Sequence, residues 1–278
     1  MGNHIIVERV LNNNVLVAVQ ENQEEVILIG KGIGFGKKKG YEVDLDSVEK
    51  LYRLEDASAQ EKYKQLLPQI NEEFVGFMND VMDHIEERMN NKLNEHIHIA
   101  LTDHIAFAIK RLNDGLDFKN PFLIEIQSLY PKEYEVAKEV VSMIHETLGF
   151  AMPDGEVGFI AIHIHSAITD KKVAEINKDS QLIQHLTSLV ESQLSIDLDK
   201  QSVDYHRLVQ HLRRAIERAH KGEALGERNK LDNLLKLEYP VCYNLAWKLI
   251  KVMQRTLQKP VDDAEAVYLT IHLQRLLS

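Results

Sequence analysis

The chain has 278 residues, a length typical of two or three domains rather than one. It is 44% hydrophobic and 27% charged, which predicts ordinary packed cores, and it lacks the run of about 18 apolar residues that a membrane span needs. Its single cysteine, Cys242, excludes an intrachain disulfide, and no secretory signal is recognisable, so we expect a cytoplasmic protein without membrane insertion. The net charge of −10 means that any nucleic-acid binding must be local.

Residues 1–56 show the pattern of a small antiparallel β domain. The β-branched runs IIVERVL and VLVAV are separated by Asn12, Asn13 and Asn14, which predicts a tight hairpin. EVILIG predicts a third strand and EKLYRLE a last one. Between them, the segment GKGIGFGKKKG holds five glycines and four lysines, which indicates a loop whose backbone closely approaches another group. A domain this small is marginal alone, and dimerisation would stabilise it.

From about residue 57 the hydrophobic period becomes helical. Apolar residues recur at three- and four-residue spacing over residues 60–89, 96–112, 134–150 and 156–168, with glycine and proline between the runs. This pattern predicts all-α helix bundles with short connections.

A long internal repeat divides the helical part. The segment that begins LYPKEYEVAK matches the one that begins EYPVCYNLAW without a gap, at a spacing of about 109 residues. The matched pairs include Tyr130-Pro131 with Tyr239-Pro240, Asp154 with Asp263, Glu156 with Glu265 and Ile162-His163 with Ile271-His272. Upstream, LTDHIAFAIKR matches LVQHLRRAIER, which places His104 opposite His211. The repeat predicts two homologous domains, 57–171 and 172–278.

The histidines His104 and His163 in one copy, and His211 and His272 in the other, occupy matching places. The structural alternative is that they are core histidines, because His104 shares a helical stripe with apolar residues. Packing alone does not require histidine four times, since cores tolerate hydrophobic exchange. Metal binding is disfavoured because His163 and His165 do not share a helix face, and no nucleophile set for catalysis is recognisable. Phosphorylation remains, because neutral imidazole is nucleophilic, and Arg111, Arg213 or Arg214 could meet the added charge.

The asparagine run and the glycine loop are the candidates for function in the β domain. The structural alternative is that both are simply turns. Phe35, between two glycines in a basic loop, is of the type that stacks on a base, and asparagine offers donors and acceptors to base edges. The loop lacks the spacing of a phosphate-binding P-loop.

These segments resemble the bgl/sac-type bacterial transcriptional antiterminators. LNNNVLVA and LIGKGIGFGKKKG are similar to their RNA-binding domain, and LTDHIAFAIKR with GEVGFIAIHIHSA, and YHRLVQHLRRA with EAVYLTIHLQRLL, resemble their two phosphotransferase-system regulation domains. LNEHIHIALTDHIAFAIKR and KNPFLIEIQSLYP are most similar to the branch that controls a glucose operon.

The resemblance implies a function and its residues. A dimer would bind a hairpin in leader RNA, exclude the terminator and so turn on a sugar transport operon, with no cofactor, no metal and no enzyme activity. The glucose-specific permease and the general phosphocarrier protein would be the partners that phosphorylate the regulation domains. The implied RNA-binding residues are Arg9, Asn12, Asn14, Gly30, Lys31, Gly32 and Phe35, and the implied phosphorylation sites are His104, His163, His211 and His272. Arg9 departs from the lysine that the family often has there.

Two rival functions are open. A DNA-binding activator with the same regulation domains would need a helix-turn-helix at its N-terminus, and IIVERVLNNNVLVAVQ is too β-branched for one. An enzyme would use the histidine-rich residues 161–166, where no recognisable catalytic set occurs.

Overall fold

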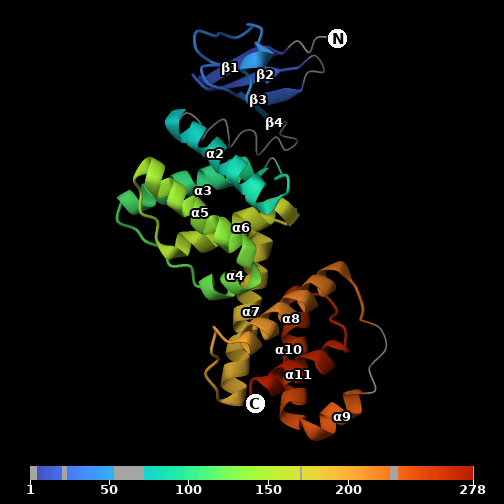
Figure 1. Ribbon diagram of the computed structural model, residues 1–278. Helices are drawn as coiled ribbons and strands as arrows, with labels where there is room; N and C mark the ends of the chain where they lie inside the picture. Colours follow the sequence, from blue (N-terminus) through green and yellow to red (C-terminus); the bar gives the residue numbers. More distant parts are fainter. Residues whose placement is uncertain are drawn as a thin grey trace. The chain divides into compact units, whose positions relative to one another are not determined.

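A computed structural model describes residues 5–20, 24–52, 72–94, 96–169, 171–225 and 231–277. Four strands are followed by ten helices in this part of the chain (Figure 1). The contacts divide it into two compact units, Met1–Lys119 with Glu135–Lys171, and Asn120–Tyr134 with Lys172–Ser278. The predicted boundary at residues 56–57 and the helical pattern expected over residues 60–71 lie outside the described residues.

The N-terminal strands form one antiparallel sheet in the order β1-β2-β3-β4. They span Ile6–Asn12, Val15–Val19, Glu25–Ile29 and Lys50–Tyr52. Asn12 pairs with Val15, so a tight turn at Asn13 and Asn14 closes the first hairpin, as the sequence predicts. The predicted small antiparallel β domain is confirmed.

The core of this sheet explains why its long loop is ordered. One cluster of buried side chains joins three strands to two loop residues, Ile33 and Val43. Its members are Ile5, Val7, Leu16, Ala18, Val26, Leu28, Ile33 and Val43. Because Ile33 lies inside the glycine-rich segment and is only 3% exposed, burial of its side chain anchors that segment to the sheet.

Four helices follow in the first unit: α2 (Glu72–Met89), α3 (His96–Asn113), most of α5 (Pro131–Leu148) and α6 (Asp154–Thr169). Their apolar residues recur every three or four positions, and side chains such as Ile85, Leu101, Ile105 and Ile144 are fully buried. Helices α3 and α6 pack against each other. This pairing brings the two predicted histidines of the first copy onto facing helices.

The second unit holds α4 (Leu123–Leu129), α7 (Val173–Leu194), α8 (Val203–Lys221), α9 (Leu231–Glu238), α10 (Pro240–Leu257) and α11 (Glu265–Arg275). Although α4 precedes α5 in the chain, it packs against α7 and α8. The Tyr205 hydroxyl donates to Glu125 Oε1 at 3.3 Å, and Gln210 Nε2 donates to the Ser128 carbonyl at 2.5 Å.

The internal repeat is visible in the backbone. Tyr130 has φ −129° and ψ 55°, and Tyr239 has φ −130° and ψ 55°. Each precedes a proline, which disfavours helical geometry in the residue before it and favours it in the residues that follow. One difference separates the copies: α9 packs against α10 and α11, whereas its counterpart α4 packs against α7 and α8.

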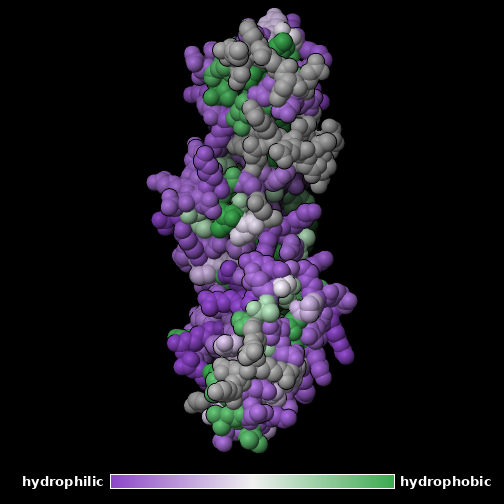
Figure 2. All heavy atoms as spheres, turned by 90° about the vertical axis from the view of Figure 1, so that its right-hand side faces the viewer, coloured by the Kyte–Doolittle hydropathy of each residue, from purple (hydrophilic) through white to green (hydrophobic). Residues whose placement is uncertain are grey.

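The face of the molecule drawn in Figure 2 is largely polar. Figure 2 shows hydrophilic residues over most of the face that it draws, with hydrophobic residues in smaller groups. Among the described helices, none is long and apolar enough to cross a membrane.

Candidate functional site

The asparagine turn and the glycine loop, separate in the sequence, are joined by hydrogen bonds. The Gly32 N–H donates to Asn14 Oδ1 at 2.7 Å, and the Gly30 N–H donates to the Asn14 carbonyl at 3.0 Å. The Gly34 N–H donates to the Asn13 carbonyl at 2.8 Å. The two segments therefore form one surface at the end of the first hairpin.

Two glycines are required by close backbone contact. A Cβ on Gly30 would lie 2.0 Å from the Ser47 carbonyl oxygen, and one on Gly34 would lie 2.3 Å from the Asn12 carbonyl oxygen. Gly32 has φ +70°, a conformation that other residues rarely adopt. The loop geometry thus depends on these positions, which explains their glycine content without any ligand.

The predicted RNA-binding residues differ in what they present to a ligand. Phe35 is 77% exposed, which is unusual for a phenylalanine and suits base stacking. Lys31 and Arg9 are also exposed. The Asn12 and Asn14 side-chain oxygens instead accept backbone hydrogen bonds, Asn12 Oδ1 from the Asn14 N–H at 2.9 Å, so both asparagines shape the loop. RNA contact by these residues stays a prediction.

Two of the loop lysines are held by the domain itself. Lys39 pairs with Glu8, and Lys37 Nζ donates to the Glu42 carbonyl at 3.2 Å. Such exposed contacts stabilise little. Of the two, only the pair with Glu8 offsets a positive charge, because the Glu42 carbonyl is neutral.

The first helical unit brings His104 of α3 and His163 of α6 together, with ring centroids 5.0 Å apart. His104 Nε2 lies 3.0 Å from Glu156 Oε2, and the Glu156 carboxylate also pairs with Arg111. The side chains of Glu156 and Arg111 are only 1% and 6% exposed, and that of His104 is 17% exposed. Phe159 stands beside His104 at 5.8 Å between ring centroids.

The second unit repeats the arrangement. The rings of His211 (α8) and His272 (α11) are 4.9 Å apart, and His211 Nε2 lies 3.0 Å from Glu265 Oε2. Arg218 Nε donates to Glu265 Oε1 at 2.8 Å. Tyr268 takes the place of Phe159, again at 5.8 Å from the histidine ring. We call these two arrangements of two histidines, a glutamate and an arginine the first and second histidine centres.

Burial keeps one histidine of each centre neutral. It lowers the pKa of His163 to about 3, with a further contribution from the charge of His104. In the same way, burial and then His211 lower the pKa of His272 to about 4. Burial by itself raises the pKa of Glu156, but its contacts with His104 and Arg111 outweigh this and leave the pKa below its usual value. Each centre therefore holds a neutral imidazole, which has a free electron pair, next to a second histidine whose Nε2 contacts a buried carboxylate.

Sequence reasoning missed part of both centres. Glu156 and Glu265 were visible only as matched positions of the repeat, with no role attached. In the second centre, Arg218 holds the carboxylate, whereas the expected Arg213 donates to the Leu129 carbonyl at 2.5 Å and stacks on Tyr130. The register of the repeat, which places Arg218 opposite Arg111, carried the signal that could have found it.

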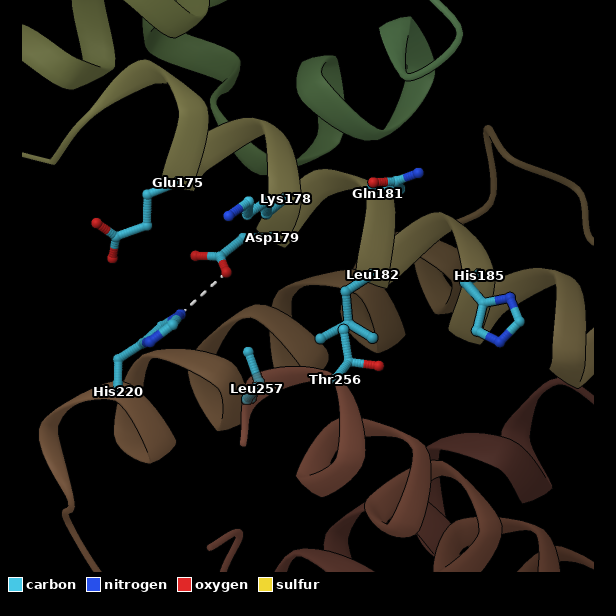
Figure 3. Close-up of a pocket in the computed structure, with 9 residues that line it drawn as sticks. All are labelled: Glu175, Lys178, Asp179, Gln181, Leu182, His185, His220, Thr256 and Leu257. Atoms are coloured by element: carbon cyan, nitrogen blue, oxygen red, sulfur yellow. Dashed lines mark hydrogen bonds and ion pairs between the residues drawn. The ribbon is translucent and has the colours of Figure 1, made fainter. Parts of the chain in front are cut away.

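The second unit also contains a pocket that is separate from the histidine centre. It has a volume of about 760 Å³ and is lined by residues of α7 and by the C-terminal ends of α8 and α10. Figure 3 shows Asp179 and His220 pointing toward each other across it, with 3.0 Å between Oδ1 and Nε2. None of the four predicted histidines lines this pocket. Among the described residues, no group of three or more histidine, cysteine or acidic side chains could hold a metal ion.

Comparisons with known proteins agree with this arrangement. The family model described as the CAT RNA binding domain matches residues 5–61, and the PRD domain model matches residues 79–167 and 184–276. The chain belongs to the family of transcriptional antiterminators that join a CAT RNA-binding domain to two PRD domains.

Relatives of known name extend along the whole chain. It is 54% identical over 276 residues to the PtsGHI operon antiterminator of Bacillus subtilis (strain 168), covering 99% of this chain and 98% of that one. It is 39% identical to the GlcA/glcB genes antiterminator of Staphylococcus carnosus (strain TM300), covering 98% and 96%. A crystal structure of GlcT CAT-PRDI matches with a TM-score of 0.54 and 56% identity, covering 60% of this chain and 99% of that one. These names describe regulators rather than enzymes.

Proposed function

We propose that this chain is a cytoplasmic antiterminator of a glucose-type transport operon. Its β domain, dimerised, binds a hairpin in leader RNA, and this hairpin excludes the overlapping terminator. The observation that carries the proposal is the surface made by the asparagine turn and the glycine loop, with Phe35 exposed at its edge. It lies within residues 5–61, the segment matched by an RNA-binding family. In this proposal the RNA-binding β domain spans residues 1–56, and the two helical regulation domains span residues 57–171 and 172–278.

The histidine centres supply the regulation. We expect phosphorylation at His104 or His163 by the sugar permease, and at His211 or His272 by the general phosphocarrier protein. A phosphoryl group adds nearly two negative charges, and on His104 or His211 these would lie beside a buried glutamate. Repulsion from that carboxylate, offset in part by the neighbouring arginine, disturbs the helix pair and with it the assembly of two β domains around one RNA.

RNA binding is tested with the full-length protein and a leader hairpin, measured over a series of salt concentrations. Phe35→Ala should weaken binding by about five- to a hundred-fold, because stacking on an aromatic side chain contributes about 1–3 kcal/mol per base. Leu45→Ala is the matched control, since Leu45 is a 47% exposed apolar residue of the same domain outside the joined surface. Equal effects of the two substitutions, or preference for duplex DNA, would contradict the proposal.

Regulation is tested with His104→Asp, which places a permanent negative charge at the first centre. We expect weaker RNA binding or antitermination, while His104→Asn, similar in size and neutral, should retain more activity. If both variants antiterminate in cells as the unchanged protein does, the regulatory part of the proposal is wrong.

A further inference from the structure

The two histidine centres have the same interior but different surroundings. Near the first centre, three large apolar side chains are exposed: Phe107 by 57%, Leu116 by 53% and Phe118 by 51%. Two of the three matching positions of the second copy are charged, Arg214 and Glu223, and the third is Leu225, which is 37% exposed. We call the first three residues the apolar rim. Exposed apolar residues gathered in one place on a protein mark an interaction surface more often than scattered ones do.

The backbone is equivalent at both rims, so the difference lies in the side chains. Gly115 ends one helix with φ +76°, and Gly222 ends its counterpart with φ +68°. The Leu116 N–H donates to the Arg111 carbonyl at 3.0 Å, as the Glu223 N–H does to the Arg218 carbonyl at 3.0 Å. At the ends of α3 and α8 the two centres therefore differ in the side chains that they present to a partner protein, and not in the backbone.

The apolar rim is tied directly to the reacting residues through Arg111. Its guanidinium carbon lies 4.5 Å from the ring centroid of Phe118 and 5.9 Å from that of Phe107. Its Nε donates to the Leu116 carbonyl at 3.2 Å, and it also binds Glu156, the carboxylate that contacts His104. Phe107 additionally follows His104 by three positions on α3, which places the two side chains on the same helix face.

We propose that Phe107, Leu116 and Phe118 form the docking surface for the protein that phosphorylates the first histidine centre, and that this donor presents an apolar collar around its own phosphorylated side chain. The inference rests on the proposed phosphorylation of these histidines. A donor must bring its phosphorus atom within bonding distance of an imidazole nitrogen, so its surface has to cover the residues around His104. At the second centre, Arg214 and Glu223 replace two of these three residues, so its donor makes charged contacts there in addition to the apolar contact that Leu225 offers.

The transfer itself balances without a further reactant. An imidazole nitrogen of the centre forms a P–N bond with its free electron pair, while the bond from phosphorus to the donor's histidine nitrogen or cysteine sulfur breaks. The donor atom keeps the bonding electrons and takes up a proton, and the acceptor ring loses the proton from its other nitrogen. The apolar rim takes no part in these bonds, because it only positions the donor.

The test measures phosphotransfer to the full-length protein from two phosphorylated donors, the glucose permease domain and the general phosphocarrier protein. Mass spectrometry of peptides shows which histidine centre has received the phosphoryl group. Phe107→Arg introduces the side chain that the second copy has at this place, and Leu116→Glu does the same. We expect each to raise the KM for the permease donor at the first centre about ten-fold, as loss of an interface anchor does, with kcat nearly unchanged. Labelling of the second centre should not change.

Two controls separate docking from other effects. Leu237→Arg makes the same change of charge at an apolar residue that is 78% exposed and belongs to the second unit, and it should leave labelling of the first centre unchanged. Arg214→Phe should improve labelling of the second centre by the permease donor. Both rim positions are exposed, so the variants should melt at the temperature of the unchanged protein.

An unchanged KM in both Phe107→Arg and Leu116→Glu would overturn the docking surface while leaving the proposed function intact. A loss of self-association in these variants, measured by analytical ultracentrifugation, would also overturn it, since a second copy would then be the occupant. If neither donor labels any histidine of the unchanged protein, the proposed phosphorylation itself is wrong and the docking surface falls with it.

Discussion

Neutralising the buried carboxylate of each histidine centre should destabilise the first centre more than the second. Glu156→Gln leaves the Arg111 side chain, only 6% exposed, without its anionic partner. Removing one member of a buried ion pair costs about 3–5 kcal/mol, and because glutamine keeps one acceptor oxygen we expect about 3 kcal/mol. The matching change, Glu265→Gln, leaves Arg218 unpaired at 21% exposure, where water can solvate it, so we expect about 1–2 kcal/mol.

Hydrogen exchange followed by mass spectrometry can measure the loss of stability in each unit separately, because each unit opens with its own free energy. The most protected amides of α3 and α6 should exchange about a hundred-fold faster in Glu156→Gln. Those of α8 and α11 should exchange about ten-fold faster in Glu265→Gln. Amides of the unit that was not changed serve as the internal reference in both variants.

Equal losses in the two variants would refute the link between burial of the arginine and the cost of leaving it unpaired. An increase in stability on Glu156→Gln would refute it more strongly, because it would mean that desolvation of the carboxylate costs more than its two contacts return. Glu156→Asp distinguishes charge from geometry, since it keeps the charge and shortens the reach by one methylene group.

Two further predictions concern the β domain and pH. Gly34→Ala should abolish RNA binding in a gel-shift assay while the helical units keep their melting behaviour, because its Cβ would lie 2.3 Å from the Asn12 carbonyl oxygen. Gly36→Ala should weaken binding less: its Cβ meets nothing within 4 Å, so the cost is only the backbone strain of φ +67°, about 1–2 kcal/mol. Burial holds the pKa of His98 and His163 at about 3, below the usual 6.5, so the unfolded chain binds more protons and stability should fall as the pH drops from about 6.5 toward 3. Each histidine contributes about 1.4 kcal/mol per pH unit, and urea unfolding between pH 7 and 5 should show a smaller loss in His98→Gln. If the free energy of unfolding falls with pH as steeply in His98→Gln as in the unchanged protein, His98 does not have the lowered pKa.

The sequence by itself determined the domain types and the positions of the four histidines. The short β-branched run VLVAV, buried at four consecutive positions, indicates a strand, whereas the three- to four-residue spacing from α2 onward indicates helices that bury one face. The gapless repeat paired His104 with His211 and His163 with His272 before any geometry was known. Glycine and asparagine content located the loop and turn of the β domain, because few other residues adopt those conformations.

Only the tertiary structure decided which residues meet. The hydrogen bond from the Gly32 N–H to the Asn14 side chain joins two segments that the local sequence pattern predicts as separate turns. The packing of α3 on α6 and of α8 on α11 selected Glu156 and Arg218 as partners of the histidines, and assigned Arg213 to α4 instead. Side-chain spacing along one helix predicts which face of the helix a residue occupies. It does not predict which other helix covers that face, because that depends on the free energy of packing the whole unit.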